Sequence, residues 1–333
     1  MIEVSNAAVV LKRYPDGIPT PADFSLTNLP IPHLSAGQVL IKTRYISLDP
    51  YVRGVIAGRH MGHQLALGTV IVGATVGEVV ESNDDRFKVG DCVLGAGGWQ
   101  SFWAESASTL RKLDPSNSTP STALGVLGMP GLTAYAGLIY LGLPKIGDTV
   151  VVSAAAGPVG ATVGQLAKRA GARAVGVVGS ADKADLILSE FGFDGAINYK
   201  TEDLAAGLAR TCPDKIDVYF DNVGGATLEA VLAQLNLRAR VVLCGLITQY
   251  NQATRPAGPN LGPVIGARAE LKGLVVYDHF DKLNHWLKLG QTLLSTGALK
   301  YREDLSHGLE QAPIAFERLM RGDNIGKTIV ALP

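Results

Sequence analysis

The segment "VVSAAAGPVG" (residues 151–160) joins an apolar run to a glycine-bearing turn that is suited to binding phosphate. Gly157 has no side chain to keep its backbone away from a pyrophosphate, and Gly160 lets the following helix pack closely on the strand. The start of that helix favours a negative charge. Pro158 falls at this helix start, where a missing N–H is tolerated, although it removes one phosphate donor. Ala155 replaces a first glycine. The alternative is a strand-to-helix corner without a ligand.

A second segment, "GVVGSADKAD" (residues 176–185), indicates which dinucleotide would bind. An acidic residue near the end of this strand selects NAD by holding the ribose hydroxyls. Here the strand ends in the small residues Gly179 and Ser180, which leave room for a 2′-phosphate, and Lys183 supplies a positive charge. Asp182 argues the other way but lies past the strand. NADP is therefore favoured, the alternative being that Lys183 is a solvated lysine at a helix start.

Charge and cysteine usage exclude several classes of protein. The chain of 333 residues carries 30 basic and 30 acidic side chains, so neither nucleic acid nor an anionic membrane is an expected partner. Cys92, Cys212 and Cys244 lie far apart, and the first residues lack the pattern of a secretory signal, which favours a reducing cytoplasm. The uncharged stretch 115–144 is interrupted by Pro130 and several glycines, so it is predicted to be buried rather than membrane-spanning.

The surrounding pattern predicts an α/β protein with two domains. Residues 1–125 contain short β-branched runs separated by turn signals, as in a small barrel-like domain. From about residue 126, apolar strands alternate with amphipathic helices, which predicts a parallel sheet covered on both faces. The Pro- and Gly-rich segment 248–263 is interpreted as a lid. The C-terminal tail is predicted to end in a helix and a short strand, which would return to the first domain.

Several phrases together resemble one family along nearly the whole chain. They are "LDPYVRG" (48–54), "GMPGLTAYAGL" (128–138), "SAAAGPVG" (153–160), "FGFDGAINYK" (191–200), "FDNVGG" (220–225), "CGLITQYN" (244–251) and "GDNIGKTIV" (322–330). The chain is similar to the zinc-independent branch of the medium-chain dehydrogenase/reductase superfamily. Within it, the nearest group contains prostaglandin/leukotriene B4 reductases, alkenal double-bond reductases and curcumin reductases.

The resemblance implies a GroES-like β-barrel domain (1–125 and 297–333) and a Rossmann domain with a doubly wound parallel sheet (126–296). NADPH would lie in the cleft between them. The implied reaction is reduction of the C=C bond of α,β-unsaturated aldehydes and ketones, with the hydride added to the β-carbon. A homodimer joined through Rossmann sheet edges, near "LKGLVVYD" (271–278), is also implied.

The resemblance also assigns residues to the cofactor. The expected contacts are Gly157, Pro158, Val159 and Gly160 at the pyrophosphate, and Lys183 and Tyr199 at the 2′-phosphate. Near the nicotinamide they are Cys244, Gly245, Leu246, Ile247, Thr248, Gln249, Tyr250 and Leu274, and elsewhere along the cofactor Thr133, Asn222, Val275, Val276 and Asn324. Two positions depart from the family pattern, which usually has alanine where Pro158 stands and an aromatic residue where Leu274 stands. These departures leave the pocket details and the substrate open.

The sequence indicates chemistry without a metal. "DPYVRG" (49–54) stands where the zinc branch of the superfamily places a cysteine ligand, and His60 and His63 have no third ligand at metal-site spacing. This pair is interpreted as loop histidines. Hydride addition to a conjugated enone spreads charge into an enolate, so the site needs a hydrogen-bond donor at the developing oxyanion.

Two tyrosines are the candidate catalytic residues. Tyr51, together with the cofactor ribose, is the candidate oxyanion donor, unless it only packs at the domain edge. Tyr250 is expected to position substrate or to protonate the α-carbon, and water is the alternative proton source. A zinc-free NADPH quinone oxidoreductase and a non-catalytic NADP-binding protein remain the competing functions.

Overall fold

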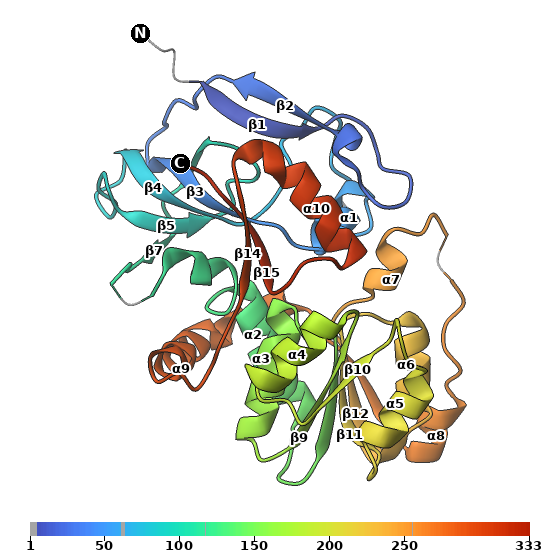
Figure 1. Ribbon diagram of the computed structural model, residues 1–333. Coiled ribbons are helices and arrows are strands. Elements are labelled where there is room, and N and C mark those ends of the chain that lie inside the picture. The colour runs from blue at the N-terminus through green and yellow to red at the C-terminus, as the bar shows by residue number, and fades with distance from the viewer. Residues whose placement is uncertain (1–4, 61–63, 117, 255) are drawn as a thin grey trace. The chain divides into compact units, whose positions relative to one another are not determined.

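The computed structural model describes residues 5–60, 64–116, 118–254 and 256–333. The chain divides into two compact units (Figure 1), of which unit 1 comprises Met1–Leu124 with Glu303–Pro333 and unit 2 comprises Gly125–Arg302. Unit 1 is built around a mixed, mainly antiparallel sheet and unit 2 around a parallel sheet. The α/β fold class predicted from the sequence is confirmed.

The main sheet of unit 1 has the strand order β14-β15-β3-β4-β5-β7, with β6 paired to β3. The strands are β3 (Gln38–Ser47), β4 (Thr75–Ser82), β5 (Cys92–Gly95), β6 (Phe102–Ser106), β7 (Arg111–Leu113), β14 (Glu303–His307) and β15 (Lys327–Ala331). β15 runs antiparallel to β3, with Val330 opposite Ile46. Helix α10 (Ala312–Arg321) connects the parallel strands β14 and β15. The end of the chain therefore completes a sheet that the first hundred residues begin.

Apolar side chains hold the remaining elements of unit 1 to this sheet. β1 (Asn6–Leu11) and β2 (Phe24–Leu29) form a separate antiparallel pair, and the short helix α1 spans Tyr51–Ile56. The ring of Trp99, which is fully buried, lies 5.7 Å from that of Phe24 and 5.4 Å from that of Phe316 on α10. Such aromatic contacts bury large apolar areas, so they join the N-terminal strand pair to the C-terminal helix.

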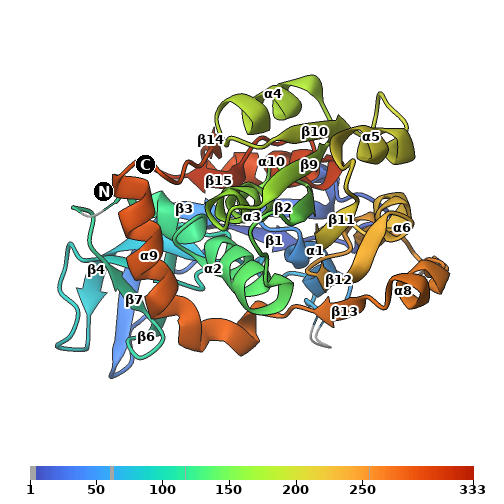
Figure 2. The same ribbon diagram turned by 90° about the horizontal axis from the view of Figure 1, so that it is seen from below.

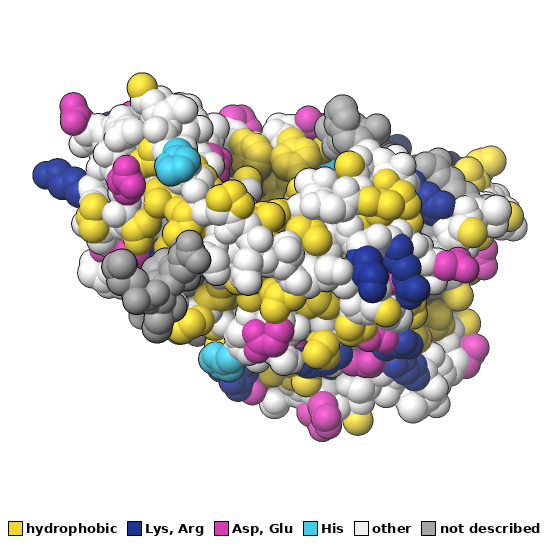
Figure 3. All heavy atoms as spheres, turned by 90° about the horizontal axis from the view of Figure 1, so that it is seen from above, with side chains coloured by type: hydrophobic (Ala, Val, Ile, Leu, Met, Phe, Trp, Pro, Cys, Tyr) yellow, Lys and Arg dark blue, Asp and Glu magenta, His cyan; other side chains and the backbone are white. Residues whose placement is uncertain are grey.

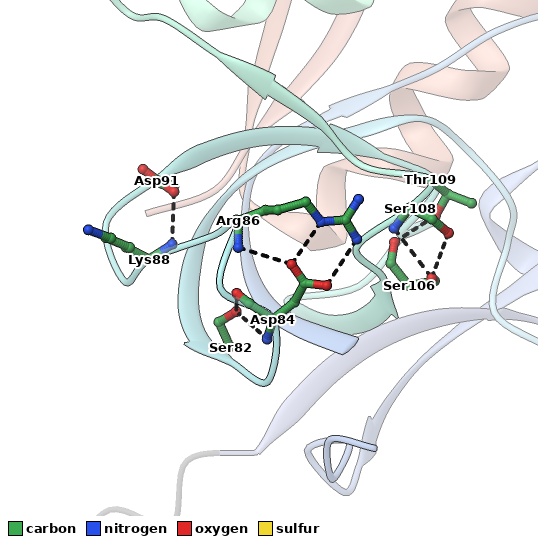
Figure 4. Close-up of polar contacts among 8 residues, drawn as sticks. All are labelled: Ser82, Asp84, Arg86, Lys88, Asp91, Ser106, Ser108 and Thr109. Carbon is green, nitrogen blue, oxygen red and sulfur yellow. Dashed lines mark hydrogen bonds and ion pairs between the residues drawn. The ribbon is translucent and has the colours of Figure 1, made fainter. Parts of the chain in front are cut away.

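The turn between β4 and β5 is organised by local polar contacts (Figure 4). The carboxylate of Asp84 accepts hydrogen bonds from the Arg86 side chain on both oxygens, at 2.8 and 2.9 Å, and from the Arg86 backbone N–H at 3.0 Å. The Arg86 guanidinium lowers the pKa of Asp84 to about 2. Asp side chains that bind their own turn backbone in this way favour chain reversal.

The parallel sheet of unit 2 has the strand order β10-β9-β8-β11-β12-β13. Its strands are β8 (Thr149–Ser153), β9 (Arg173–Val178), β10 (Gly195–Asn198), β11 (Ile216–Asp221), β12 (Leu235–Leu243) and β13 (Glu270–Gly273). Along the chain, the strands begin with β8 in the middle of the sheet and proceed outward to β10 on one side. They then continue from β11, beside β8, outward to β13 on the other side. This is the Rossmann order, in which ligands bind at the carboxyl ends of the strands where the direction reverses, here between β8 and β11.

Helices cover both faces of this sheet (Figures 1 and 2). They are α2 (Met129–Ala136), α3 (Pro158–Arg169), α4 (Ala181–Ser189), α5 (Leu204–Thr211), α6 (Gly225–Leu232), α8 (Gly262–Ala267) and α9 (Leu283–Ser295). Val150 and Val152 pack with the cluster that includes α2, α3 and α9, whereas Val151 packs with the cluster under α5 and α6. This alternation explains why the β8 sequence is continuously apolar.

Two local features add to the sequence-based expectations. The β-branched run 69–82 forms a regular strand only from Thr75, because Ile71 bonds through its backbone to Val9 at 3.0 Å and to Trp99 at 2.9 Å instead of extending β4. The segment 248–263, interpreted as a lid, overlaps the short helix α7 (Ile247–Tyr250) and ends at the start of α8. Among the helices of the described residues, none is long and apolar enough to cross a membrane.

Candidate cofactor and active site

The glycine-bearing turn joins β8 to α3 in unit 2. A Cβ on Gly160 would lie 2.5 Å from the Ala154 carbonyl oxygen and 2.8 Å from the Ala155 Cα, so helix and turn approach more closely than any side chain permits. The one left-handed residue between Ser153 and Pro158 is Ala154, with φ of 51°, and not Ala155. Alanine therefore fits where a first glycine is expected. Pro158 is the first residue of α3, and Gly157, Pro158 and Val159 are half-buried at its start.

A buried carboxylate lies at the end of the neighbouring strand. Asp221, the last residue of β11, is fully buried. Its Oδ1 accepts hydrogen bonds from the hydroxyls of Ser153 at 3.0 Å and Tyr219 at 2.8 Å. The backbone N–H groups of Val223 and Gly224 donate to the same oxygen, each at 2.9 Å. Within the described part of the chain, Oδ2 has no partner. This residue thus ties the ends of β8 and β11 to the loop that follows.

The same residue also holds the segment after β12. The backbone carbonyl of Asp221 accepts from the N–H of Cys244 at 2.8 Å and of Gly245 at 3.1 Å. Burial raises the pKa of the Tyr250 hydroxyl. A Cβ on Gly245 would lie 3.3 Å from that hydroxyl, so the glycine leaves room for it. With its pKa raised, the Tyr250 phenol keeps its proton at neutral pH and can donate it.

Further contacts fix the flanking residues of this segment. Asn222 donates from its amide nitrogen to the Ser153 carbonyl at 2.8 Å. Thr248, on α7, donates from its hydroxyl to the Val223 carbonyl at 2.7 Å. Ile247 and Gln249 of α7 are half-buried. The structure therefore brings Asn222 and the whole 244–250 segment to the same sheet edge as the glycine turn.

The residues expected at the 2′-phosphate form a corner between β9 and β10. A Cβ on Gly179 would lie 3.1 Å from the Tyr199 ring, so a side chain here would require that ring to shift by a few tenths of an ångström. Ser180 is the N-cap of α4, and its hydroxyl accepts the backbone N–H of Lys183 at 3.4 Å. Lys183 is half-buried and Asp182 is exposed. The corner thus places a lysine and a partly exposed tyrosine on either side of two small residues.

Other predicted contact residues lie farther along the fold of unit 2. Thr133, on α2, donates to the Met129 carbonyl at 2.8 Å and is buried. Leu274 is buried in the core, where its side chain is so close to Gly137 that a Cβ there would lie 2.6 Å away. Val275 is 47% exposed, and Val276 is partly buried. Leu274 thus has a packing role, and its contact with a nicotinamide stays a prediction.

In unit 1, Tyr51 is the first residue of α1 and contacts a histidine. The ring centroids of Tyr51 and His60 are 5.1 Å apart, and burial lowers the pKa of His60. His63, the other member of the predicted histidine pair, lies outside the described residues. Within the described ranges, no cluster of three or more His, Cys, Asp or Glu residues could hold a metal ion.

Asn324, the predicted cofactor contact in the tail, precedes β15. Its amide nitrogen donates to the Gly326 carbonyl at 2.9 Å, and Gly326 has a φ of 79°. Lys327 follows and forms a buried ion pair with Asp49, at 2.8 Å. Sequence reasoning missed this pair and the Asp221 network. The signals available were an aspartate ending an apolar strand in "YFDN" and one preceding Pro50.

Comparison with known proteins identifies the family. A family model described as "N-terminal domain of oxidoreductase" matches residues 7–113, and one described as "Zinc-binding dehydrogenase" matches residues 158–291. The chain is 42% identical to the NADPH-dependent curcumin reductase of Escherichia coli, over 98% of this chain and 96% of that protein. It is 42% identical to the NADP⁺-dependent 2-alkenal reductase of Nicotiana tabacum, over 98% of each.

This chain belongs to the medium-chain dehydrogenase/reductase family. A solved structure agrees: CurA from Vibrio vulnificus in complex with NADPH matches with a TM-score of 0.94 and 40% identity, covering 98% of this chain and 99% of that one. The residues of this family member fit a dinucleotide. The position of Gly160 has no space for a side chain, and α3 begins at the switch point of the sheet.

The Cys244 thiol should react slowly even at alkaline pH. Burial and the Asp221 carboxylate raise its pKa to about 12, so the thiolate, which is the nucleophile, is scarce below that pH. We expect the iodoacetamide alkylation rate at Cys244, followed by mass spectrometry, to keep rising through pH 10. In Asp221→Asn, the rise should level off at lower pH because one negative charge is gone. A plateau below pH 9 in the wild-type protein would contradict this.

Proposed function

We propose that this protein is an NADPH-dependent reductase of the C=C bond of α,β-unsaturated aldehydes and ketones. The observation that carries the proposal is the match, over nearly the full length at about 40% identity, to proteins named NADPH-dependent curcumin reductase and NADP⁺-dependent 2-alkenal reductase. The glycine turn and the Gly179–Lys183 corner support NADPH as the cofactor.

The chain's own residues supply binding and proton handling. NADPH, when bound, provides the hydride that adds to the β-carbon of the substrate. Backbone at the α3 start receives the pyrophosphate, and Lys183 with Tyr199 receives the 2′-phosphate. The Tyr51 hydroxyl donates to the substrate carbonyl oxygen, where negative charge develops as the enolate forms. Burial raises the pKa of Tyr250, so its phenol is protonated at neutral pH and donates its proton to the α-carbon of the substrate.

The decisive experiment is a substrate panel. Purified protein and NADPH are mixed separately with enals, enones, quinones and saturated ketones, and NADPH oxidation is followed by absorbance. We expect turnover of enals and enones to the saturated carbonyl compounds. Turnover of quinones alone would favour the quinone oxidoreductase alternative, and NADPH binding without any turnover would favour a non-catalytic protein.

In Tyr250→Phe, enone turnover should fall about 10²-fold, whereas Tyr14→Phe, at an exposed tyrosine, should not change it.

Lys183→Ala should affect one cofactor only. Removal of a charged partner of the 2′-phosphate should raise KM for NADPH by about 10- to 100-fold. KM for NADH should change little, because NADH has no phosphate there. Lys145→Ala, at an exposed lysine before β8, is the matched control and should leave both values unchanged. Equal losses with both cofactors would remove the 2′-phosphate role of Lys183.

We also propose a cytoplasmic homodimer joined through β13. This strand is the end member of the sheet order, and nearby apolar side chains are exposed, including Leu271, Val275, Tyr277 and Phe280. An unpaired edge with apolar neighbours is suited to pairing with a second copy. By contrast, the face in Figure 3 intersperses acidic, basic and apolar side chains. The three free cysteines support the cytoplasm.

The oligomer proposal has a direct measurement. Light scattering after size exclusion should give twice the chain mass for the wild-type protein and the chain mass for Leu271→Lys, which places a charge beside the β13 edge. Lys42→Ala, on the unit 1 sheet, is the control and should stay dimeric. A monomeric wild-type protein would refute the dimer.

A further inference from the structure

Unit 1 contains an ion pair that is almost completely removed from water. The side chains of Lys327 and Asp49 are 3% and 9% exposed, and Lys327 Nζ lies 2.8 Å from Asp49 Oδ1. The same ammonium donates to the Leu48 carbonyl at 2.6 Å. Asp49 Oδ2 accepts a short hydrogen bond from the Ser47 hydroxyl. Every oxygen of the carboxylate is therefore occupied, and the lysine has two acceptors.

The pair lies where two functional segments meet. Asp49 is two residues before Tyr51, and Lys327 is three residues after Asn324. Backbone bonds join the same segments, because β15 pairs with β3 and the Leu48 N–H donates to the Thr328 carbonyl at 3.2 Å. The ion pair thus joins two residues that lie close in sequence to the candidate hydroxyl of Tyr51 and to the candidate tail amide of Asn324.

Stability does not by itself account for such a pair. Burying two charges costs desolvation free energy that their attraction often only offsets, and neutral replacements of similar volume are frequently as stable. A third ionisable group faces the same lysine, since Glu303 on β14 is directly opposite Lys327 on β15. Burial raises the pKa of Glu303, and Lys327 acts against that rise. What this charge arrangement adds over apolar packing is a single defined geometry.

We propose that the Asp49–Lys327 pair is a positioning element of the reduction, which fixes the segment carrying the Tyr51 hydroxyl against the segment carrying Asn324. The pair does not touch substrate; it acts through Tyr51. The inference rests on the proposed function and deepens it, because it states how the oxyanion donor is held in place.

The test variant is the neutral pair Asp49→Asn/Lys327→Met. The asparagine still accepts from Ser47, and neither member of the pair is left as an unpaired charge. Glu303 loses the nearby ammonium but still accepts from the Ser121 hydroxyl at 3.0 Å. The matched control is Arg240→Met in unit 2, which breaks the shielded ion pair between Arg240 and Asp148. In that pair Arg240 Nη2 lies 2.6 Å from Asp148 Oδ2, and both side chains are 15% exposed. For each protein we would measure urea unfolding, NADPH-binding stoichiometry and enone kcat per NADPH-binding site.

We expect the neutral variant to bind NADPH with full stoichiometry and to lose about 10²-fold in kcat per site, as small displacements of reacting groups do. The control should lose stability but keep its kcat per site. The discriminating measurement is a cycle with Tyr51→Phe: if the pair acts through the hydroxyl, neutralising it in the Tyr51→Phe protein should cost less than twofold. A purely structural pair would not show this dependence.

Three outcomes would overturn the inference while leaving enone reduction intact: kcat per site within twofold of wild type, losses that multiply with Tyr51→Phe, or a Tyr51→Phe protein with wild-type kcat. If the double variant does not fold, Asp49→Asn alone serves, with an expected 3- to 10-fold loss that must also vanish in the Tyr51→Phe background. Failure of the wild-type protein to reduce any enone is a separate result, and it would refute the proposed function itself.

Discussion

The carboxyl-terminal edge of the unit 2 sheet depends on one buried negative charge. Asp221 receives four donors on one side-chain oxygen and two more on its backbone carbonyl. These donors come from the ends of three neighbouring strands, so the loops after β8, β11 and β12 cannot move independently. Because Asp221 is fully buried, removal of its carboxylate would leave several hydrogen-bond donors unsatisfied, and each would cost about 1–3 kcal/mol of folding stability. The loops that would receive a dinucleotide are therefore preorganised before it binds.

The same charge has a chemical consequence at Cys244. A thiolate is a good nucleophile toward conjugated carbonyl compounds, whereas a thiol is not. With a pKa raised to about 12, Cys244 stays protonated at neutral pH. A cysteine in the segment proposed to line the nicotinamide is therefore compatible with an electrophilic substrate, because burial and the nearby carboxylate suppress the thiolate that would react with it.

Much of this arrangement was predictable from local sequence. The apolar run and glycines around residue 157 specify strand, turn and helix, and the alternation after residue 126 specifies a covered parallel sheet. The Asp221 network was not predicted, because one donor, Ser153, lies 68 positions away along the chain and others are backbone groups whose direction depends on the assembled sheet. The Asp49–Lys327 ion pair was not predicted for the same reason, since 278 positions separate its members. The β-branched run 69–82 forms a regular strand only from Thr75, since Ile71 bonds through its backbone to Val9 and Trp99, which are distant in sequence.

The return of β14 and β15 to the sheet of β3 has a consequence for biosynthesis. The ribosome completes all of unit 2 before it makes either strand, so the parallel-sheet unit has every residue it needs while the other unit still lacks its last partners. Domains tend to fold as they emerge. The backbone groups on one edge of β3 then stay unpaired until the final thirty or so residues of the chain have been synthesised. During that interval the exposed strand edge makes the nascent protein most vulnerable to aggregation, and chaperone binding would protect it most.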